Sequence, residues 1–275
     1  MTVDNDIMNA IRILHNDNTM ELKKVKIFTN YSLKHFKKYK LNNKEVLSRI
    51  NSLDEILDLL SYNSSVTCFS KNKLDIYFLK LLIQMHNIDR KKYMDFIFKD
   101  YGKNGKILSK KYYDLVKDTL DSKTKYFFDE LYKYCFYSNI SISGLIEKQK
   151  YDKKVYDMYV KNYLSGKYNN ILQNNNLVYI KSNDVDITNI TFENQFDFIN
   201  LSYNIYDKTN INKYLHKEEN YKQLLSKTGK IQSFVSQNKI DIKDHKVMET
   251  RSILDPNTPN NDCKKEYAYV YRKSQ

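Results

Sequence analysis

The amino-acid sequence predicts an α/β fold of the Rossmann-like kind: a mostly parallel sheet that ends in an antiparallel hairpin and carries a helical insertion. Three observations support this. Between residues 44 and 86 the pattern alternates strand, helix, strand, helix, which favours parallel strands joined by right-handed crossovers. Residues 89–175 then show only helical periodicity. The chain closes with two alternating segments around a turn-rich loop that holds both prolines.

The first part of the chain is expected to begin with helices and then to alternate strands with helices. Residues 4–16 and 28–40 are expected to be helices, because each places apolar residues at helical spacing. They belong to an N-terminal helical segment over residues 1–41. The segments that follow are a strand at "KEVLSRI", a helix over residues 53–62, a strand at "SVTCFS" and a helix at "KLDIYFLKLLIQMH".

The second half returns from helices to strands. The middle segments, such as "TKYFFDELYKYCFY", have aromatic residues at helical spacing and do not alternate like strands. Strands are then expected at "NLVYIKSN", "FDFINLS" and "KIQSFVSQ". A helix over residues 211–229 is expected between the last two, with Gly229 at its C-cap. The closing hairpin pairs "KVMETRSIL" with "EYAYVYRK".

The length of 275 residues fits one large domain or two small ones. We expect a single α/β domain over residues 1–275, with residues 89–175 as a helical insertion or cap. The tyrosine stripes of this insertion are expected to pack in a core. The alternative is a platform on which the bases of a single-stranded nucleic acid stack beside lysines.

The chain is strongly basic, with a net charge of +13 and a pI near 9.3. Such a charge suits an anionic partner, nucleic acid above all, because clustered cations gain from counterion release. The basic residues are nevertheless dispersed among acids, as in "DRKKYMDFIFKD". The excess of Asn, Lys, Ile and Tyr also fits an AT-rich genome, such as that of a phage. The charge therefore permits nucleic-acid binding without requiring it.

The cysteines and histidines give no metal signature. The three cysteines, Cys68, Cys135 and Cys263, lie far apart and form no CxxC pair, so reduced thiols and no structural zinc are expected.

The N-terminus does not resemble a signal peptide, and no apolar run approaches the ~18 residues of a membrane span. We expect a cytoplasmic protein without a membrane span. The sequence also contains no P-loop, no HExxH and no Ser-His-Asp signature.

Two stretches resemble a known family. "NNKEVLSRINSLDEILDLLSYNSSVTCFSKNKLDIYFLKLLI" is similar to the opening of a bacterial S-adenosylmethionine (SAM) dependent transferase-like family, related to the aminocarboxypropyl transferases of betaine-lipid synthesis. "FDFINLSYNIYD", "VMETRSIL" and "YAYVYRK" resemble its later strands. The resemblance implies a class I methyltransferase-like fold, and it implies SAM as cofactor if the protein is active.

The cofactor turn departs from the family's pattern. Residues Asn51, Ser52, Leu53 and Asp54 fall on the turn that would hold SAM, but Asn51 and Leu53 occupy the two glycine places. Glycine is needed there because the chain turns tightly and its backbone must approach the ligand without a Cβ. Leu53 would put an aliphatic side chain where the methionine moiety or adenosine passes. Ser70 stands where an acid would receive the ribose hydroxyls.

Further site residues follow later strands. Asn183 and Asp184, with Asp186 nearby, fall where such enzymes hold the adenine amino group, although a solvated turn explains them as well. Polar residues also follow the apolar part of the strand that begins at Phe196. Ligands bind at the carboxyl ends of parallel strands, so the residues expected to contact a substrate or partner are Asn200, Ser202, Asn204 and Asp207. A polar loop that caps the next helix is the other interpretation, and Tyr203 is an apparent extra residue that would shift Asn204.

Two functions remain open, and so does the question of whether the chain is an enzyme. One is a protein with a SAM-transferase-like fold that has lost catalysis and its cofactor. It would act as a binding or scaffold protein in a nucleic-acid complex or a larger assembly, and it would be encoded by a phage or another AT-rich genome. The other is an active SAM-dependent methyl- or aminocarboxypropyl-transferase on a small or lipid-like acceptor. Leu53 and Ser70 favour the first.

Overall fold

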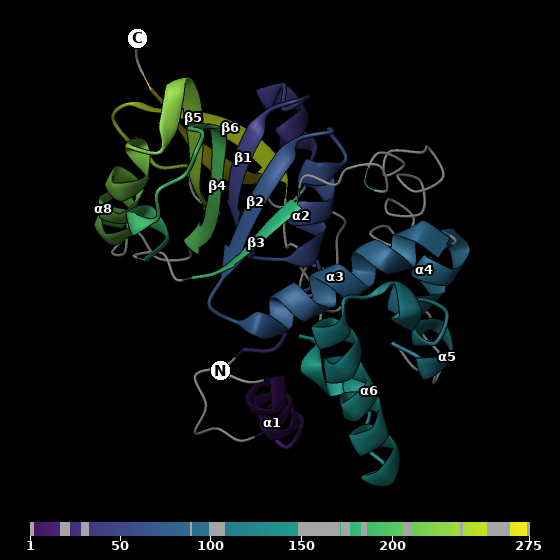
Figure 1. Cartoon of the computed structure of the whole chain (residues 1–275). Helices are drawn as coiled ribbons and strands as arrows, with labels where there is room; N and C mark the ends of the chain where they lie inside the picture. Colours follow the sequence, from purple (N-terminus) through teal and green to yellow (C-terminus); the bar gives the residue numbers. More distant parts are fainter. Residues whose placement is uncertain are drawn as a thin grey trace. The chain divides into compact units, whose positions relative to one another are not determined.

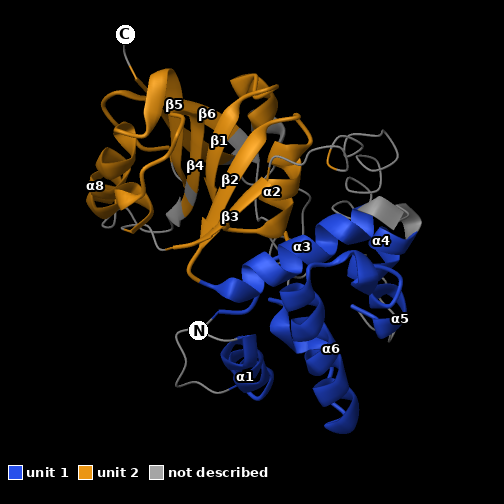
Figure 2. Cartoon of the chain, viewed as in Figure 1, with its two compact units in different colours: residues 1–27, 72–167 blue, residues 28–71, 168–275 orange. Residues whose placement is uncertain are grey.

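The computed structural model arranges the chain in two compact units (Figure 2). Unit 1 is formed by residues 1–27 and 72–167, and unit 2 by residues 28–71 and 168–275. The residues that the structure describes are 3–16, 23–28, 33–88, 90–98, 108–147, 171, 177–182, 186–205, 211–236, 239–251 and 265–273.

Unit 2 is built on a seven-stranded sheet with the order β3-β2-β1-β4-β5-β7-β6 (Figure 1). Strands β1 to β5 pair in parallel, and β7 is antiparallel to both β5 and β6. The strands are β1 (Glu45–Arg49), β2 (Ser65–Ser70), β3 (Leu177–Lys181), β4 (Phe196–Ile205), β5 (Leu225–Ser236), β6 (His245–Arg251) and β7 (Lys265–Arg272). The parallel part follows the order of doubly wound folds. The predicted fold class, a Rossmann-like and mostly parallel sheet that ends in an antiparallel hairpin, is confirmed.

The central strands form where the sequence has short apolar runs, because a parallel sheet is covered on both faces. The core of unit 2 includes Leu47 of β1, Phe69 of β2 and Ile199 of β4, all at most 1% exposed. Phe234 of β5 stacks on Tyr269 of β7 with ring centroids 4.5 Å apart, which fastens the hairpin to the parallel strands.

Among the described residues of unit 2, the helices include α2 (Leu53–Leu60), α8 (Ile211–Lys222) and the 3₁₀ segments η1 (Leu33–Tyr39) and η5 (Asp186–Asn189). The α-helix expected over residues 28–40 is instead the 3₁₀ helix η1 within the described part. Its apolar residues recur every third position, which matches three residues per turn. Phe36 and Tyr39 are buried as a result, and both rings contact Phe198 of β4.

The predicted C-cap role of Gly229 is wrong. Helix α8 ends at Lys222, and Gly229 lies inside β5. A Cβ at this position would come within 2.9 Å of the backbone oxygen of Phe196 and of a Leu225 methyl group. Glycine is therefore required by the close approach of β4 to β5, not by a helix end.

Unit 1 is helical. It contains α1 (Val3–Leu14), α3 (Lys73–Ile88), α4 (Arg90–Phe98), α5 (Lys110–Tyr113), α6 (Ser122–Tyr137) and the 3₁₀ turns η2 (Lys117–Thr119) and η3 (Ile142–Leu145). Tyr77 of α3 stacks on Phe127 of α6 at 4.3 Å, and its hydroxyl donates to the buried Asp6 of α1 (3.0 Å). In the predicted helical insertion over residues 89–175, residues 89, 99–107, 148–170 and 172–175 lie outside the described residues.

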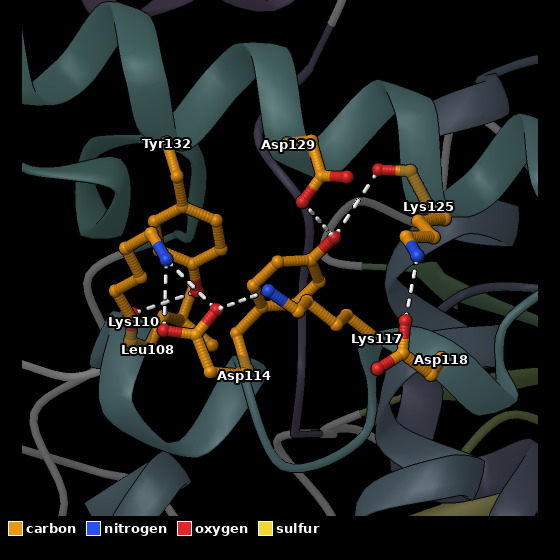
Figure 3. A network of polar contacts seen from close by, with 9 residues as sticks. Leu108, Lys110, Asp114, Lys117, Asp118, Lys125, Asp129 and Tyr132 are labelled. Carbon is orange, nitrogen blue, oxygen red and sulfur yellow. Dashed lines mark hydrogen bonds and ion pairs between the residues drawn. The ribbon is translucent and has the colours of Figure 1, made fainter.

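A polar network joins α5 to α6 in unit 1 (Figure 3). The fully buried Tyr113 donates its hydroxyl to Asp129 (2.8 Å) and stacks on Tyr132 at 4.8 Å. Around it, Asp114 accepts from Lys110 and Lys117, Asp118 pairs with Lys125, and Tyr132 donates to the Leu108 carbonyl. These two tyrosines pack in a core and do not present their rings for base stacking.

A buried carboxylate links α8 to β5 and β6 in unit 2. Glu218, 1% exposed, accepts a hydrogen bond from Ser233 and lies 2.7 Å from His245 Nε2. The other ring nitrogen of His245 is 2.9 Å from the carbonyl of Lys243. Both neighbours are acceptors, so the protonated imidazolium, which donates from both nitrogens, satisfies this geometry best.

The stability of the protein is expected to fall as pH rises through neutrality. Burial lowers the pKa of His245, but its bonds to Glu218 and Lys243 outweigh burial and raise the pKa above 6.5. A group whose pKa is higher in the folded state than in the unfolded state stabilises the protein when it is protonated. This stabilisation is fully present below about pH 6 and is lost as pH rises through the folded-state pKa. Urea denaturation between about pH 6 and about pH 8 measures this slope. His245→Gln should flatten it, and an unchanged slope in that variant would contradict the assignment.

Candidate functional site

The candidate site lies at the carboxyl edge of the sheet, between β1 and β4. The strand order reverses at this point, since β1 is followed outward by β2 on one side and by β4 on the other. In open α/β sheets ligands bind at such a switch point. The fold brings two of the predicted groups together here: the turn after β1, with Asn51, and the strand β4, with Asn200.

Hydrogen bonds within the chain fill this switch point. The side-chain amide of Asn51 donates to the carbonyl of Leu201 in β4 (2.9 Å) and to Glu55 Oε2 (3.4 Å). Arg49 at the end of β1 donates to the Asn51 side-chain oxygen (2.9 Å). The turn after β1 is thereby tied to the neighbouring strand by its own side chain.

Glu55 is the centre of a buried polar cluster that we name the Glu55 cluster: Asn51, Glu55, Asn200 and Ser48. Asn200 is fully buried and donates to Glu55 Oε2 (3.2 Å) and to the hydroxyl of Ser48 (3.1 Å). Glu55 is 1% exposed. The predicted site residue Asn200 therefore contacts the protein's own carboxylate.

Sequence reasoning missed Glu55, Arg49 and Ser48. All eight residues of α2 are buried, including Asp54, Glu55 and Asp58. Helical periodicity assigns acids in an amphipathic helix to the solvent face. The available signal was the spacing of Asn51 and Glu55, which lie four positions apart at the start of a helix.

The remaining residues of the turn lie as follows. Ser52 is the N-cap of α2 but makes no capping bond, and its buried hydroxyl has no hydrogen-bond partner among the described residues. Leu53 is fully buried at the first position of α2, and Asp54 is 4% exposed. Ser70 ends β2, is 8% exposed, and its carbonyl accepts from the Ser182 amide (3.2 Å).

Strand β4 ends at Ile205, beyond the predicted end at Ser202, and so also includes Asn204. Between Asn200 and Tyr203 its register with β5 shifts: Asn200 pairs with Gln232 and Tyr203 with Phe234. One extra residue of β4 is accommodated there as a bulge, a feature that bends a strand next to functional sites. Asn183, Asp184 and Asp207 lie outside the described residues.

Tyr203 links the switch point to α8. Its ring lies under the guanidinium of Arg49 (4.8 Å) and the ammonium of Lys217 (5.0 Å), and it contacts Tyr214 of α8 at 4.9 Å. The ring is 5% exposed. These cation–π contacts hold Arg49 in place, where it donates to Asn51.

The described part of the chain was also compared with the requirements of a metal site, a reactive thiol and a membrane span. There, no three His, Cys, Asp or Glu side chains converge on a position that could hold a metal ion. Cys68 and Cys135 are buried thiols, and burial raises the pKa of Cys135 to about 11; Cys263 lies outside the described residues. Among the helices described, none combines the length and apolar character of a membrane span.

Comparison with known proteins gives structural similarity only. No protein-family description matches the sequence, and no curated protein matches it either. An rRNA methylase from Streptococcus thermophilus is 9% identical, with 86% of this chain and 94% of that chain covered and a TM-score of 0.37. TrmN from Thermus thermophilus is 8% identical, with 85% of this chain and 45% of that chain covered and a TM-score of 0.32.

Proposed function

We propose that this chain is a non-catalytic binding protein that retains a class I methyltransferase-like fold, does not bind SAM, and docks an anionic partner through its basic surface. The partner is nucleic acid, alone or within a larger assembly, and a phage or similar AT-rich genome is the expected source. The observation that carries the proposal is the pair of bonds from Asn51 to Leu201 and Glu55, which close the switch point with the chain's own atoms.

The residues of the turn do not fit SAM. A cofactor turn exposes backbone amides to its ligand, and glycine allows that approach. Here Leu53, in one glycine place, is packed in the core of unit 2. The cluster also sets a buried carboxylate, Glu55, at the switch point, which disfavours a ligand that itself carries a carboxylate, as SAM does. The neutral hydroxyl of Ser70 cannot accept the two ribose hydroxyls as a carboxylate would.

The alternative is an active SAM-dependent methyl- or aminocarboxypropyl-transferase on a small or lipid-like acceptor. One observation favours it: the hydroxyl of Ser52 is buried at the start of α2 without a hydrogen-bond partner among the described residues. Buried polar groups are normally paired, so a lone hydroxyl beside a helix N-terminus is compatible with a missing ligand. Transfer from SAM requires mainly positioning, so few catalytic groups would be needed.

Calorimetry with SAM and its demethylated product distinguishes the two. We expect no binding heat for either compound at concentrations up to about 1 mM. Micromolar binding that is weakened by Asp54→Ala would contradict the proposal and support the transferase. Asp241→Ala, at an exposed position of the same unit, is the control for loss of one carboxylate.

A further inference from the structure

A groove of about 510 Å³ lies at the amino edge of the sheet in unit 2, the edge opposite the Glu55 cluster. Lys44 directly precedes β1, and Asp197 and Phe198 are near the start of β4. Phe198 pairs with Lys230 of β5, which in turn pairs with Arg272 of β7. The volume is that of a small-ligand site.

The groove is strongly cationic. Its lining holds five basic side chains and one acid: Lys40, Lys44, Lys230, Arg272, Lys273 and Asp197. Asp197 is already engaged, because Lys44 lies 3.6 Å from it and Ser226 donates to it at 3.2 Å. No carboxylate of the described residues forms an ion pair with Lys40, Lys230 or Arg272, so their charges are not compensated within that part of the chain.

Two of these charges oppose each other at a cost in stability. Lys230 and Arg272 are directly opposite in the antiparallel pair of β5 and β7, and therefore lie on the same face of the sheet. Like charges at such positions destabilise a sheet. The pKa of Lys230 is lowered, mainly by burial. Nearby positive charges lower it further, in the order Arg272, Lys40, Lys246 and Lys44.

The wall of the groove is fixed before any ligand arrives. Tyr39 donates its hydroxyl to Gln232 of β5 (2.8 Å) and packs on Phe198 with ring centroids 4.7 Å apart. Lys40 follows in the left-handed conformation with φ of 54°, which is uncommon for a residue with a side chain. The next residue, Leu41, is buried, and its carbonyl accepts from Ser64 (2.7 Å). Ordering of this wall would not oppose binding.

We propose that this groove is a binding site for phosphate groups, with Lys230 and Arg272 as the principal contacts and Lys40 and Lys44 at its rim. Arginine and lysine are the side chains that recognise phosphate, arginine through paired N–H donors. The surplus of cations suits a ligand with at least two negative charges, such as a diphosphate or two consecutive phosphates of a nucleic-acid backbone. The phosphate site stands whether or not the carboxyl edge binds SAM; its extension to nucleic acid rests on the proposed function.

The test measures binding of two probes to the full chain at low ionic strength: pyrophosphate by calorimetry and a short single-stranded oligonucleotide by fluorescence anisotropy. Lys230→Gln and Arg272→Gln each remove one charge at similar length. Each is expected to weaken binding about tenfold, the value of one lost charge-assisted hydrogen bond. Lys213→Gln, an exposed lysine of α8 outside the groove, is the matched control and should change affinity less than twofold, roughly the effect of one surface charge.

Folding is monitored in the same variants. Each groove variant relieves the opposition of like charges, so its thermal midpoint should equal or exceed that of the unaltered chain. If such a variant is folded and no longer binds the probe, the loss is due to the missing groove side chain and not to unfolding.

The outcomes separate the ligand sources. If pyrophosphate and the oligonucleotide both bind and both depend on Lys230 and Arg272, the site takes phosphate from either source. Binding of the oligonucleotide alone, with affinity that falls steeply as salt rises, assigns the groove to a nucleic-acid backbone. Binding of pyrophosphate alone assigns it to a small phosphorylated ligand and counts against nucleic acid as the docked partner. If neither probe binds at about 1 mM, or the groove variants behave like Lys213→Gln, the inference is overturned. SAM titrations use the opposite edge, so failure of the proposed function would be seen separately.

Discussion

Replacement of Leu53 by alanine is expected to lower the free energy of unfolding by about 3 kcal/mol, the usual cost of a cavity at a buried leucine. Leu53 is fully buried at the first position of α2. Equilibrium denaturation in urea measures the change. Leu115, an exposed leucine in unit 1, is the matched position, and Leu115→Ala should cost less than about 1 kcal/mol.

The variant that places glycine at this position is the sharper form of this test. Leu53→Gly should be at least as destabilising as Leu53→Ala, because glycine adds backbone freedom to the unfolded chain. It should not create SAM binding, since Asn51 and Glu55 still fill the switch point. A Leu53→Gly protein that keeps its stability and binds SAM would mean that the leucine only blocks a site that is otherwise intact.

Asn200→Leu is expected to destabilise the protein by about 2 to 3 kcal/mol. Asn200 is fully buried and donates to Glu55 and to Ser48, so its removal takes a hydrogen-bond donor from a carboxylate that is itself buried. Leucine keeps the branched skeleton of asparagine but its methyl groups are bulkier, so part of the cost is steric and the double variant is needed to measure the electrostatic part.

The double variant identifies the cause. In Glu55→Gln the charge is already gone, so the added cost of Asn200→Leu should be smaller than in the unaltered chain, with a coupling of about 1 kcal/mol or more. Additive costs would show that Asn200 does not act through Glu55. Asn204→Leu is not a suitable control, because it changes a second predicted contact. Asn212→Leu, at an exposed position of α8 in unit 2, is suitable.

The sheet could be predicted from sequence because its strands have a local cause. The apolar runs that became β1 and β2 are bounded by polar residues, and their limits follow from the pattern alone. The role of Gly229 could not be predicted, since its reason is the approach of Phe196 from another strand. The sequence pattern around a glycine that follows a helix does not distinguish a helix C-cap from a position where two strands approach closely.

The candidate site was predicted only in part, for a similar reason. Asn51 and Asn200 could be found because each directly follows apolar residues of a strand. Their common partner, Glu55, is buried by tertiary packing that helical periodicity does not reveal. The groove at the amino edge was not predicted at all. Lys40, Lys230 and Arg272 come from three separate elements, and only the pairing of β5 with β7 brings the last two together.

The placement of the two edges has a consequence for how this chain can change over time. Seven positions separate Lys44 from Asn51, about 20 Å of extended backbone, which exceeds the distance over which charges interact in physiological salt. Substitutions at one end of β1 therefore leave the electrostatics of the other end nearly untouched. The charges that line one edge can therefore change without altering the charge environment of the other edge.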